Sequence, residues 1–361
     1  MENYIVSARK YRPNTFDEVV GQKHVTNTLL NAINKNHLAQ ALLFTGPRGV
    51  GKTTSARILA KLINADSVED ENHDFSFNIF ELDAASNNTV DDMRSLIDQV
   101  RFAPQVGRYK VYIIDEVHML SAQAFNAFLK TLEEPPKHAI FILATTEKHK
   151  IIPTILSRCQ IYDFKRISVD DILSHLQIVA KKEGIEAEEK GLRVVAQKAD
   201  GALRDALSIF DRLATFNNQK ITYQDVIENL RILDYEYYFK TVDLVLGQDH
   251  SGLFNLFNEI LENGFDGHLY LSGLASHLRD LLVCTQPSTV DLLETDEETK
   301  KRYLTQSQKT TGAFLLPALK ILTEADVRYK SSNNTRLLVE LALLELANLA
   351  DPEGLKKKSL N

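Results

Sequence analysis

The stretch GPRGVGKTT, residues 46–54, contains the residue types that hold phosphate groups in proteins. It matches the pattern G-x-x-x-x-G-K-[ST], in which glycines let backbone N–H groups wrap the phosphates, Lys52 reaches the β and γ oxygens, and Thr53 ligates Mg²⁺. An apolar run precedes the stretch and a helical pattern follows it, which favours this function over an ordinary glycine turn. We predict a nucleoside triphosphate site whose loop comprises Gly46, Pro47, Arg48, Gly49, Val50, Gly51, Lys52, Thr53 and Thr54.

A pair of acids ends the apolar run in VYIIDEVH, further along the chain. Asp115 is placed to hold Mg²⁺ through water, and Glu116 is the right group to orient and deprotonate an attacking water molecule. The alternative is a solvated acidic strand end, which the phosphate-binding pattern disfavours. Two adjacent acids indicate that the protein hydrolyses its nucleotide rather than only binding it.

Two hydroxyl side chains end another apolar run, AIFILATT. Thr145 and Thr146 fall where ligands bind in parallel sheets, so one of them is expected to sense the γ-phosphate. A threonine at a strand end is common, and the sequence leaves open which of the two faces the phosphate.

Composition sets the class of protein. The chain has 361 residues, is 44% hydrophobic and 25% charged, and has a net charge of −7, which is typical of a globular protein without a wholesale basic coat. Cys159 and Cys284 lie too far apart for a disulfide framework or a metal site, which favours a reducing compartment. No signal peptide or membrane span is evident, so we expect a cytoplasmic protein.

Short apolar runs that alternate with helical patterns must position these groups. Such alternation predicts an α/β core with a parallel sheet that is buried on both faces. One intervening helix is expected to start at Ser121 as its N-cap and to bury Phe125 and Phe128 before Pro135 ends it. The five runs are residues 41–45, 78–84, 110–116, 139–146 and 160–164.

The second half of the chain shows only helical patterns. We divide the chain into a nucleotide-binding core at residues 1–166, a helical domain at 167–228 without strands, and a second helical domain at 229–355. The last helical pattern, TRLLVELALLELANL, is apolar on more than one face, which predicts burial in its own domain or against neighbouring subunits.

The order of motifs resembles one family closely. The run RKYRPNTFDEVVGQ, GPRGVGKT, ELDAASN, VYIIDEVHMLS, FNAFLKTLEEPP, FILATTE, ILSRCQ and GALRDALS is similar to the AAA+ clamp-loader ATPases, above all the gamma/tau subunits of bacterial DNA polymerase III. The resemblance is dense over residues 4–215 and looser to about 350. It implies ATP and Mg²⁺ as cofactors, a helical lid at 167–228 and a helical oligomerisation collar at 229–355.

The resemblance also implies roles for single residues. Arg158 matches the arginine of a Ser-Arg-Cys signature that enters the ATP site of a neighbouring subunit, and Arg204 matches a sensor arginine on the lid. Without the family, Arg158 would be an ordinary surface arginine. The segment that closes over the base matches Tyr11, Arg12, Pro13, Phe16, Val19, Val20 and Gly21, although packing against the first helix explains these residues equally well.

The implied partners are delta-type and delta-prime-type subunits, the sliding clamp and primer-template DNA, with hetero- or homo-oligomerisation through the collar. Helix starts at Asn87, Asn88, Thr89 and Ser121, with Arg94, are candidate DNA contacts, and Phe102, Ala103 and Pro104 are candidate clamp contacts. The family usually carries a four-cysteine zinc module after the phosphate loop. Residues 65–77 contain no cysteine, so we expect no zinc site there and interpret His73 as part of an acidic solvated loop.

Three other functions share part of these motifs. A different AAA+ DNA motor, such as a branch-migration helicase, would keep both nucleotide motifs. A stator subunit would bind nucleotide without hydrolysing it, which intact Lys52, Thr53, Asp115 and Glu116 disfavour. A small-molecule kinase would place a substrate pocket where the lid and collar are expected.

Overall fold

The computed structural model describes residues 5–65, 77–216, 220–293 and 295–350. The chain divides into two compact units, Met1–Ile221 and Thr222–Asn361, and each is described by itself. Among the described residues, no helix has the length and apolar character needed to cross a bilayer. The predicted zinc-free loop with His73 lies outside the described residues.

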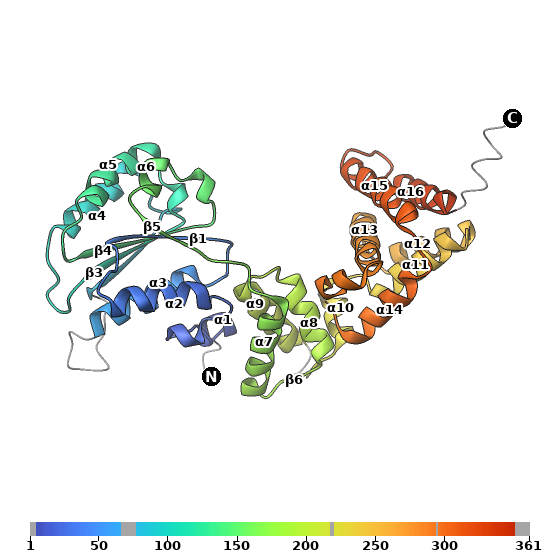
Figure 1. Ribbon diagram of the computed structural model, residues 1–361, viewed down its shortest axis with the longest axis horizontal. Helices are drawn as coiled ribbons and strands as arrows, with labels where there is room; N and C mark the ends of the chain where they lie inside the picture. The colour runs from blue at the N-terminus through green and yellow to red at the C-terminus, as the bar shows by residue number, and fades with distance from the viewer. Residues whose placement is uncertain (1–4, 66–76, 217–219, 294, 351–361) are drawn as a thin grey trace. The chain divides into compact units, whose positions relative to one another are not determined.

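The first unit contains a five-stranded sheet in the order β2-β3-β4-β1-β5, and every neighbouring pair is parallel (Figure 1). The predicted parallel α/β core is therefore confirmed. All residues of β1 and β4 are buried, because near-continuous apolar runs can be covered on both faces. The strands are β1 (Ala41–Thr45), β2 (Ile79–Asp83), β3 (Lys110–Asp115), β4 (Ala139–Thr145) and β5 (Gln160–Asp163).

Helices cover both faces of this sheet (Figure 1). On one face, α4 (Val90–Val100), α5 (Ala122–Glu133) and α6 (Pro153–Leu156) pack on the sheet, and α2 (Lys23–Asn34) and α3 (Lys52–Ala65) pack on the other. The Ser121 hydroxyl accepts a hydrogen bond from the Ala124 N–H at 3.2 Å, which confirms the predicted cap of α5. Phe125 and Phe128 are buried as predicted.

Three helices complete the first unit: α7 (Val169–Glu183), α8 (Glu189–Lys198) and α9 (Leu203–Phe216). The short N-terminal α1 (Ser7–Lys10) packs against α9. The expectation that strands disappear after residue 167 is wrong in one detail, because β6 (Glu186–Ala187) and β7 (Lys220–Ile221) form a small parallel pair. Their two-residue length leaves no periodicity for a sequence pattern to reveal. The single-turn helices are η1 (Phe16–Glu18), η3 (Val117–Met119) and η4 (Lys148–Lys150).

Apart from the six-residue turn η5 (Pro287–Leu292), the described elements of the second unit are α-helices around one apolar core. In the last helix one face is buried, whereas Leu337 and Leu341 keep 57% and 50% of their surface exposed. Of the two predicted kinds of burial, burial in its own domain therefore holds for one face only, and burial of the second face against neighbouring subunits stays a prediction. The helices are α10 (Tyr223–Leu230), α11 (Tyr235–Leu246), α12 (His250–Glu262), α13 (Gly267–Cys284), α14 (Glu297–Ser307), α15 (Gly312–Tyr329) and α16 (Thr335–Leu349).

Candidate nucleotide-binding site

A pocket of about 560 Å³ lies in the first unit at the carboxyl ends of the strands. Its walls come from the N-terminal segment, the phosphate loop, the ends of β2 and β3, Ile167 and α9. The sequence-predicted residues among its lining are Tyr11, Arg12, Pro13, Val19, Val20, Arg48, Gly49, Val50, Gly51, Lys52, Thr53, Thr54, Asp115, Glu116 and Arg204.

The backbone of residues 46–51 needs glycine where it turns. Gly46 has φ of 141°, and a Cβ there would lie 2.2 Å from the Phe164 carbonyl oxygen. Gly51 has φ of 101°, a conformation that residues with a side chain rarely adopt. These turns bring the chain to α3, which starts at Lys52. The first N–H groups of α3 therefore lie next to the phosphate loop.

Lys52 is a buried cation, with 6% of its surface exposed. Its Nζ donates to the carbonyl oxygens of Gly46 and Pro47, each at 2.7 Å. Burial lowers the pKa of Lys52, against the opposing influence of Glu116 and Asp115. Within the described part of the chain no carboxylate lies within 4.0 Å of its ammonium group, so the charge suits an anion that enters the pocket.

A hydroxyl and a carboxylate meet next to this lysine. The Thr53 hydroxyl donates to Asp115 Oδ2 at 2.7 Å. This hydrogen bond joins the phosphate loop to the end of β3. Oxygen ligands of this kind are what Mg²⁺ prefers, and it usually completes its coordination with water and phosphate oxygens. The residues present therefore fit a magnesium ion that is bound together with a nucleotide.

Glu116 follows in a left-handed backbone conformation, with φ of 47° and ψ of 44°. Such a conformation is uncommon for a residue with a long side chain and is often found at functional sites. Its Oε2 accepts hydrogen bonds from the Thr146 N–H at 3.2 Å and from the Thr146 hydroxyl at 2.9 Å. Thr146 therefore holds the carboxylate in place.

The two threonines at the end of β4 have different environments. Thr145 is fully buried, and its hydroxyl lies 3.0 Å from His118 Nδ1 and accepts from the Glu147 N–H at 3.0 Å. Neither threonine lines the pocket itself. The structure thus brings Thr146 to Glu116 and Thr145 to a histidine.

Three arginines join Lys52 around the pocket: Arg12, Arg48 and Arg204. Burial lowers the pKa of Arg12, and the nearby charges of Arg57 and Arg204 lower it further. Cations that lower one another's pKa in this way repel one another, and an anionic ligand bound between them would relieve that repulsion. The Arg204 N–H also approaches the Gly49 carbonyl at 3.5 Å, which ties α9 to the phosphate loop.

Tyr11 connects the pocket to α7. Its hydroxyl donates to Glu183 Oε1 at 2.5 Å, and the Lys10 ammonium contacts the same oxygen at 2.6 Å. These partners lower the pKa of Glu183, and burial together with Glu183 raises the pKa of Tyr11 to about 12. The segment that lines the pocket is therefore anchored to the helical part of the unit.

Arg158 does not line this pocket. Its guanidinium donates to the Thr154 carbonyl at 2.8 Å and to Glu133 Oε1 at 2.5 Å, and 32% of the side chain is exposed. The structure therefore separates Arg158 from the other predicted site residues of its own chain.

Sequence reasoning did not single out several residues at the site. Asp83 ends β2 directly beside Asp115 in the sheet register, and strand order would have been needed to place it there. Glu183 lies far from Tyr11 in the sequence, so no local pattern could reveal it. His118, two residues after Glu116, and Asp83 both belonged to motifs of the family resemblance, and that was the accessible signal for them.

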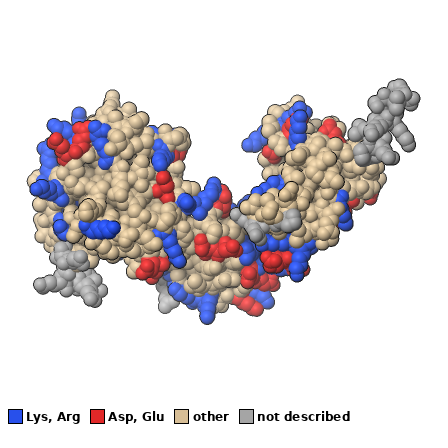
Figure 2. All heavy atoms as spheres, in the orientation of Figure 1, with Lys and Arg blue, Asp and Glu red and all other residues tan. Residues whose placement is uncertain are grey.

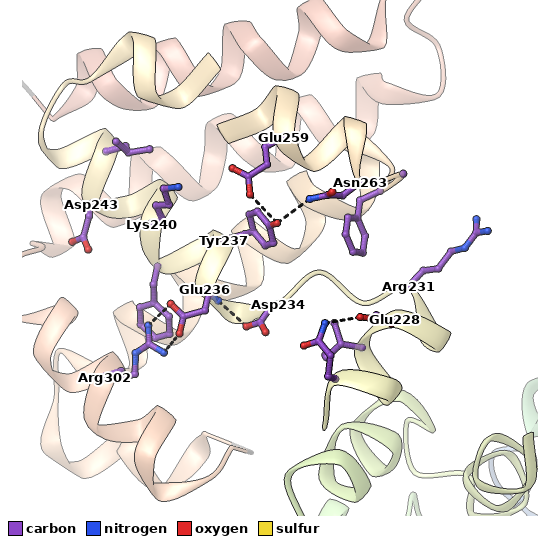
Figure 3. Close-up of a pocket in the computed structure, with 16 residues that line it drawn as sticks. Glu228, Arg231, Asp234, Glu236, Tyr237, Lys240, Asp243, Glu259, Asn263 and Arg302 are labelled. Atoms are coloured by element: carbon purple, nitrogen blue, oxygen red, sulfur yellow. Dashed lines mark hydrogen bonds and ion pairs between the residues drawn. The ribbon is translucent and has the colours of Figure 1, made fainter. Parts of the chain in front are cut away.

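A larger cavity, of about 1200 Å³, lies in the second unit between α10, α11 and α12 (Figure 3). Several contacts join residues of its own walls. Arg302 pairs with Glu236, and the Tyr237 hydroxyl bonds Glu259 and Asn263, each at 3.1 Å. The cations that line it, Arg231, Lys240 and Arg302, are exposed, whereas Lys52 is buried, so the smaller pocket is the better nucleotide site.

Comparisons with known proteins agree with this geometry. The family model described as "DNA polymerase III, delta subunit" matches residues 21–168, the model for the clamp-loader subunit ATPase lid domain matches 171–218, and the model for domain III of subunits gamma and tau matches 221–358. The Thermotoga maritima RuvB Holliday junction branch migration motor shares the fold, with a TM-score of 0.50, 23% identity, and coverage of 65% of this chain and 79% of that one.

Curated relatives extend along nearly the whole chain. DNA polymerase III subunit tau of Bacillus subtilis is 38% identical over 99% of this chain and 67% of its own length, and tau of Escherichia coli is 36% identical over 95% and 55%. Subunit gamma of Buchnera aphidicola is 33% identical over 95% of this chain and 99% of its own length. The chain thus spans about half to two thirds of the tau relatives and nearly all of that gamma relative. It belongs to the gamma and tau family of DNA polymerase III clamp-loader subunits.

Proposed function

We propose that this chain is an ATP-hydrolysing motor subunit that opens a sliding clamp and loads it on primer-template DNA. The observation that carries the proposal is the convergence of Lys52, the Thr53–Asp115 pair and the anchored Glu116 around one pocket. A protein that only held nucleotide would not need a carboxylate in a strained backbone conformation, fixed by two hydrogen bonds.

The residues of this chain divide the work. Lys52 and the glycine loop hold the triphosphate, and Thr53 and Asp115 hold Mg²⁺, which neutralises phosphate charge when bound. Glu116 orients the attacking water and takes its proton, with Thr146 keeping the carboxylate aligned. Tyr11, Arg12, Pro13 and Val20 close over the base, and Arg204 reaches the phosphates from α9.

Arg158 completes the site of a neighbouring subunit. Its position outside its own pocket supports a role in trans, where its charge would stabilise the transition state of phosphoryl transfer. Residues 167–228 act as the lid and 229–355 as the collar through which subunits assemble. Exposed leucines of the second unit, including Leu316, Leu337 and Leu341, supply apolar surface for that assembly.

We propose that delta-type and delta-prime-type subunits are the neighbours, and that the complex acts in the cytoplasm. Thr89 caps α4 and Ser121 caps α5, each through one backbone N–H group, and the other first-turn N–H groups of these helices are candidate contacts to DNA phosphates. Phe102 is 70% exposed, which supports an apolar contact to the clamp. Acidic and basic side chains are interspersed on the face shown in Figure 2, so DNA contacts would depend on local placement rather than on a basic coat.

The test is steady-state ATP hydrolysis over a protein concentration series, with and without primer-template DNA. We would compare the native chain with Arg158→Ala, with Lys52→Ala and with a mixture of the two. Arg101→Ala is the matched control, because Arg101 is an exposed arginine that pairs with exposed Asp98 at 3.7 Å.

We expect activity per chain to rise with concentration and the mixture to recover activity, because an intact phosphate loop on one chain can meet an intact arginine on another. Loss of Arg158 should lower turnover by about 10³-fold. Concentration-independent activity with a harmless Arg158→Ala would contradict the shared site. Processive DNA unwinding would favour a branch-migration motor, a phosphorylated small molecule would favour a kinase, and binding without turnover would favour a stator subunit.

A further inference from the structure

A buried histidine lies behind the two candidate catalytic elements. The His118 side chain is 6% exposed and sits on η3, directly after Glu116 and Val117. Its Nδ1 lies 3.0 Å from the Thr145 hydroxyl and 3.4 Å from Glu116 Oε2, and its Nε2 lies 3.2 Å from Glu147 Oε1. One imidazole therefore contacts the ends of both β3 and β4.

One hydrogen-bond arrangement gives both ring nitrogens and the Thr145 hydroxyl a partner. The Thr145 oxygen already accepts from the Glu147 N–H, so its own hydrogen is free to be donated to His118 Nδ1. Nδ1 is then an acceptor, and Nε2 carries the hydrogen that is donated to Glu147. This neutral tautomer satisfies both ring nitrogens, as a buried polar side chain requires.

We infer that His118 is a positioning residue for ATP hydrolysis. It holds Glu116 and the end of β4 in the positions from which Glu116 orients the water that attacks the nucleotide. The inference rests on the proposed ATPase function and deepens it. Thr146 binds the Glu116 carboxylate through two hydrogen bonds, and the imidazole ring packs beside the same Oε2 atom, with Nδ1 at 3.4 Å, so the ring limits rotation of the carboxylate sterically.

Glu147 extends this network away from the nucleotide pocket. Its carboxylate also bonds Lys150 at 2.9 Å, in the short turn η4 that leads toward α6 and Arg158. His118 therefore joins the carboxylate of its own site to the start of the segment that carries Arg158. A purely structural histidine in the apolar core would contact neither group.

The experiment uses variants that keep one hydrogen bond at a time. His118→Asn places an amide near the Nδ1 position and keeps a partner for Thr145, whereas His118→Gln places one near Nε2 and keeps a partner for Glu147. His118→Phe keeps the ring shape and loses both. His149→Asn is the matched control, because His149 also approaches Glu147, at 3.6 Å, but is 76% exposed and does not touch Glu116.

Each 361-residue chain would be measured for ATP turnover with DNA and clamp, for affinity for a fluorescent ADP analogue, and for thermal unfolding. We expect His118→Phe to lower kcat by about 10²-fold with unchanged nucleotide affinity, since positioning acts on the transition state. His118→Asn should recover most of the activity, because it restores the contact beside Glu116, and His149→Asn should match the native chain. Nitrogen NMR of labelled histidine should show the Nε2–H tautomer in the native chain.

Several results would overturn the inference. Native turnover in His118→Phe, or an equal loss of turnover and nucleotide affinity, would leave His118 a packing residue only. An Nδ1–H tautomer would contradict the hydrogen-bond arrangement. If the substitutions at 118 unfold the chain, Glu147→Gln tests the same contact from a side chain that is 35% exposed, and normal turnover there would also contradict the proposal. Absence of turnover in the native chain would instead reject the proposed function, and the role of His118 with it.

Discussion

The two units of this protein each bury a histidine, with opposite consequences. His118 lies among carboxylates and threonines at the edge of a sheet, beside the pocket. His277 lies in the helical core of the second unit, 1% exposed, with Tyr303 and Gln306 each at 2.9 Å. His118 contacts side chains at the candidate catalytic site, including the Glu116 carboxylate. The hydrogen-bond partners of His277 are the neutral side chains of Tyr303 and Gln306.

This difference follows from the architecture of each unit. Parallel strands end together, so polar residues after several strands gather at one edge and face a ligand. A helical unit without such an edge can bury polar groups only if they satisfy one another, as when Gln306 donates to the Phe239 carbonyl at 2.8 Å. We therefore expect substitutions of the polar residues at the strand ends of the first unit to change activity, and substitutions of the buried polar residues of the second unit to change stability.

The largest effect is expected at Glu116. Glu116→Gln should lower ATP turnover by about 10³-fold, or roughly 4 kcal/mol, because an amide cannot accept the proton of the attacking water. Nucleotide affinity should stay within a few-fold of native, because Lys52 and Thr53 are unchanged. Single-turnover hydrolysis and equilibrium binding measure the two quantities. An equal fall in both would show that Glu116 acts in binding, and the proposed division of roles would fail.

Acid should destabilise the second unit through His277. Burial lowers the pKa of His277 from 6.5 to about 4, against the hydrogen bond to Gln306 and with a smaller effect of Arg302. The unfolded chain takes up a proton below pH 6.5 that the folded unit resists, so the stabilisation is complete above pH 6.5 and is lost as the pH falls toward 4. The loss should reach about 3 kcal/mol at 1.36 kcal/mol per unit of pKa.

Cys284 gives a local readout of this effect, because it is buried in the same helix, α13. The measurement uses a Cys159→Ser chain in urea and a disulfide reagent that reacts in acid. The rate at which this reagent labels Cys284 should rise as the pH falls from 6.5 to 4. His277→Gln should weaken this pH dependence. A pH-independent labelling rate of Cys284 in the chain that retains His277 would mean that His277 is accessible to protons in the folded unit.

A smaller effect is expected where the pocket meets α7. Tyr11→Phe removes the hydroxyl that donates to Glu183, and we expect nucleotide affinity to fall by about tenfold, since a hydrogen bond to a charged group contributes about 1.5 kcal/mol. Turnover at saturating ATP should be unchanged. Glu183→Gln should reproduce the loss, and Glu186→Gln, at an exposed acid that pairs with Lys220 at 3.9 Å, should not. Additive losses in the double variant would contradict a shared hydrogen bond.

The smallest effect on folding is expected at α16. Leu341→Gln should change the stability of the isolated chain by no more than about 0.5 kcal/mol, because the side chain is 50% exposed. If this face joins subunits, the same substitution should weaken assembly with partner subunits, as sedimentation velocity would show. Leu343→Gln, at a position that is 1% exposed, is the contrasting variant and should unfold the unit.

The amino-acid sequence alone determined the core fold and most of the site. Five apolar runs predicted the five strands, because buried parallel strands need continuous apolar residues. The glycine loop, Lys52, Thr53 and the acid pair could be predicted because they are adjacent in sequence and their spacing reflects local backbone geometry.

Only the tertiary structure decided contacts between distant segments. Which threonine holds Glu116, where Glu183 meets Tyr11, and that Arg158 lies outside its own pocket all depend on the packing of elements far apart along the chain. His118 was visible as a residue, but its role depends on β4 lying beside β3 in the sheet. Hydrogen bonds act over about 3 Å in space regardless of sequence separation, so a sequence can name the donors and acceptors while the fold determines which of them meet.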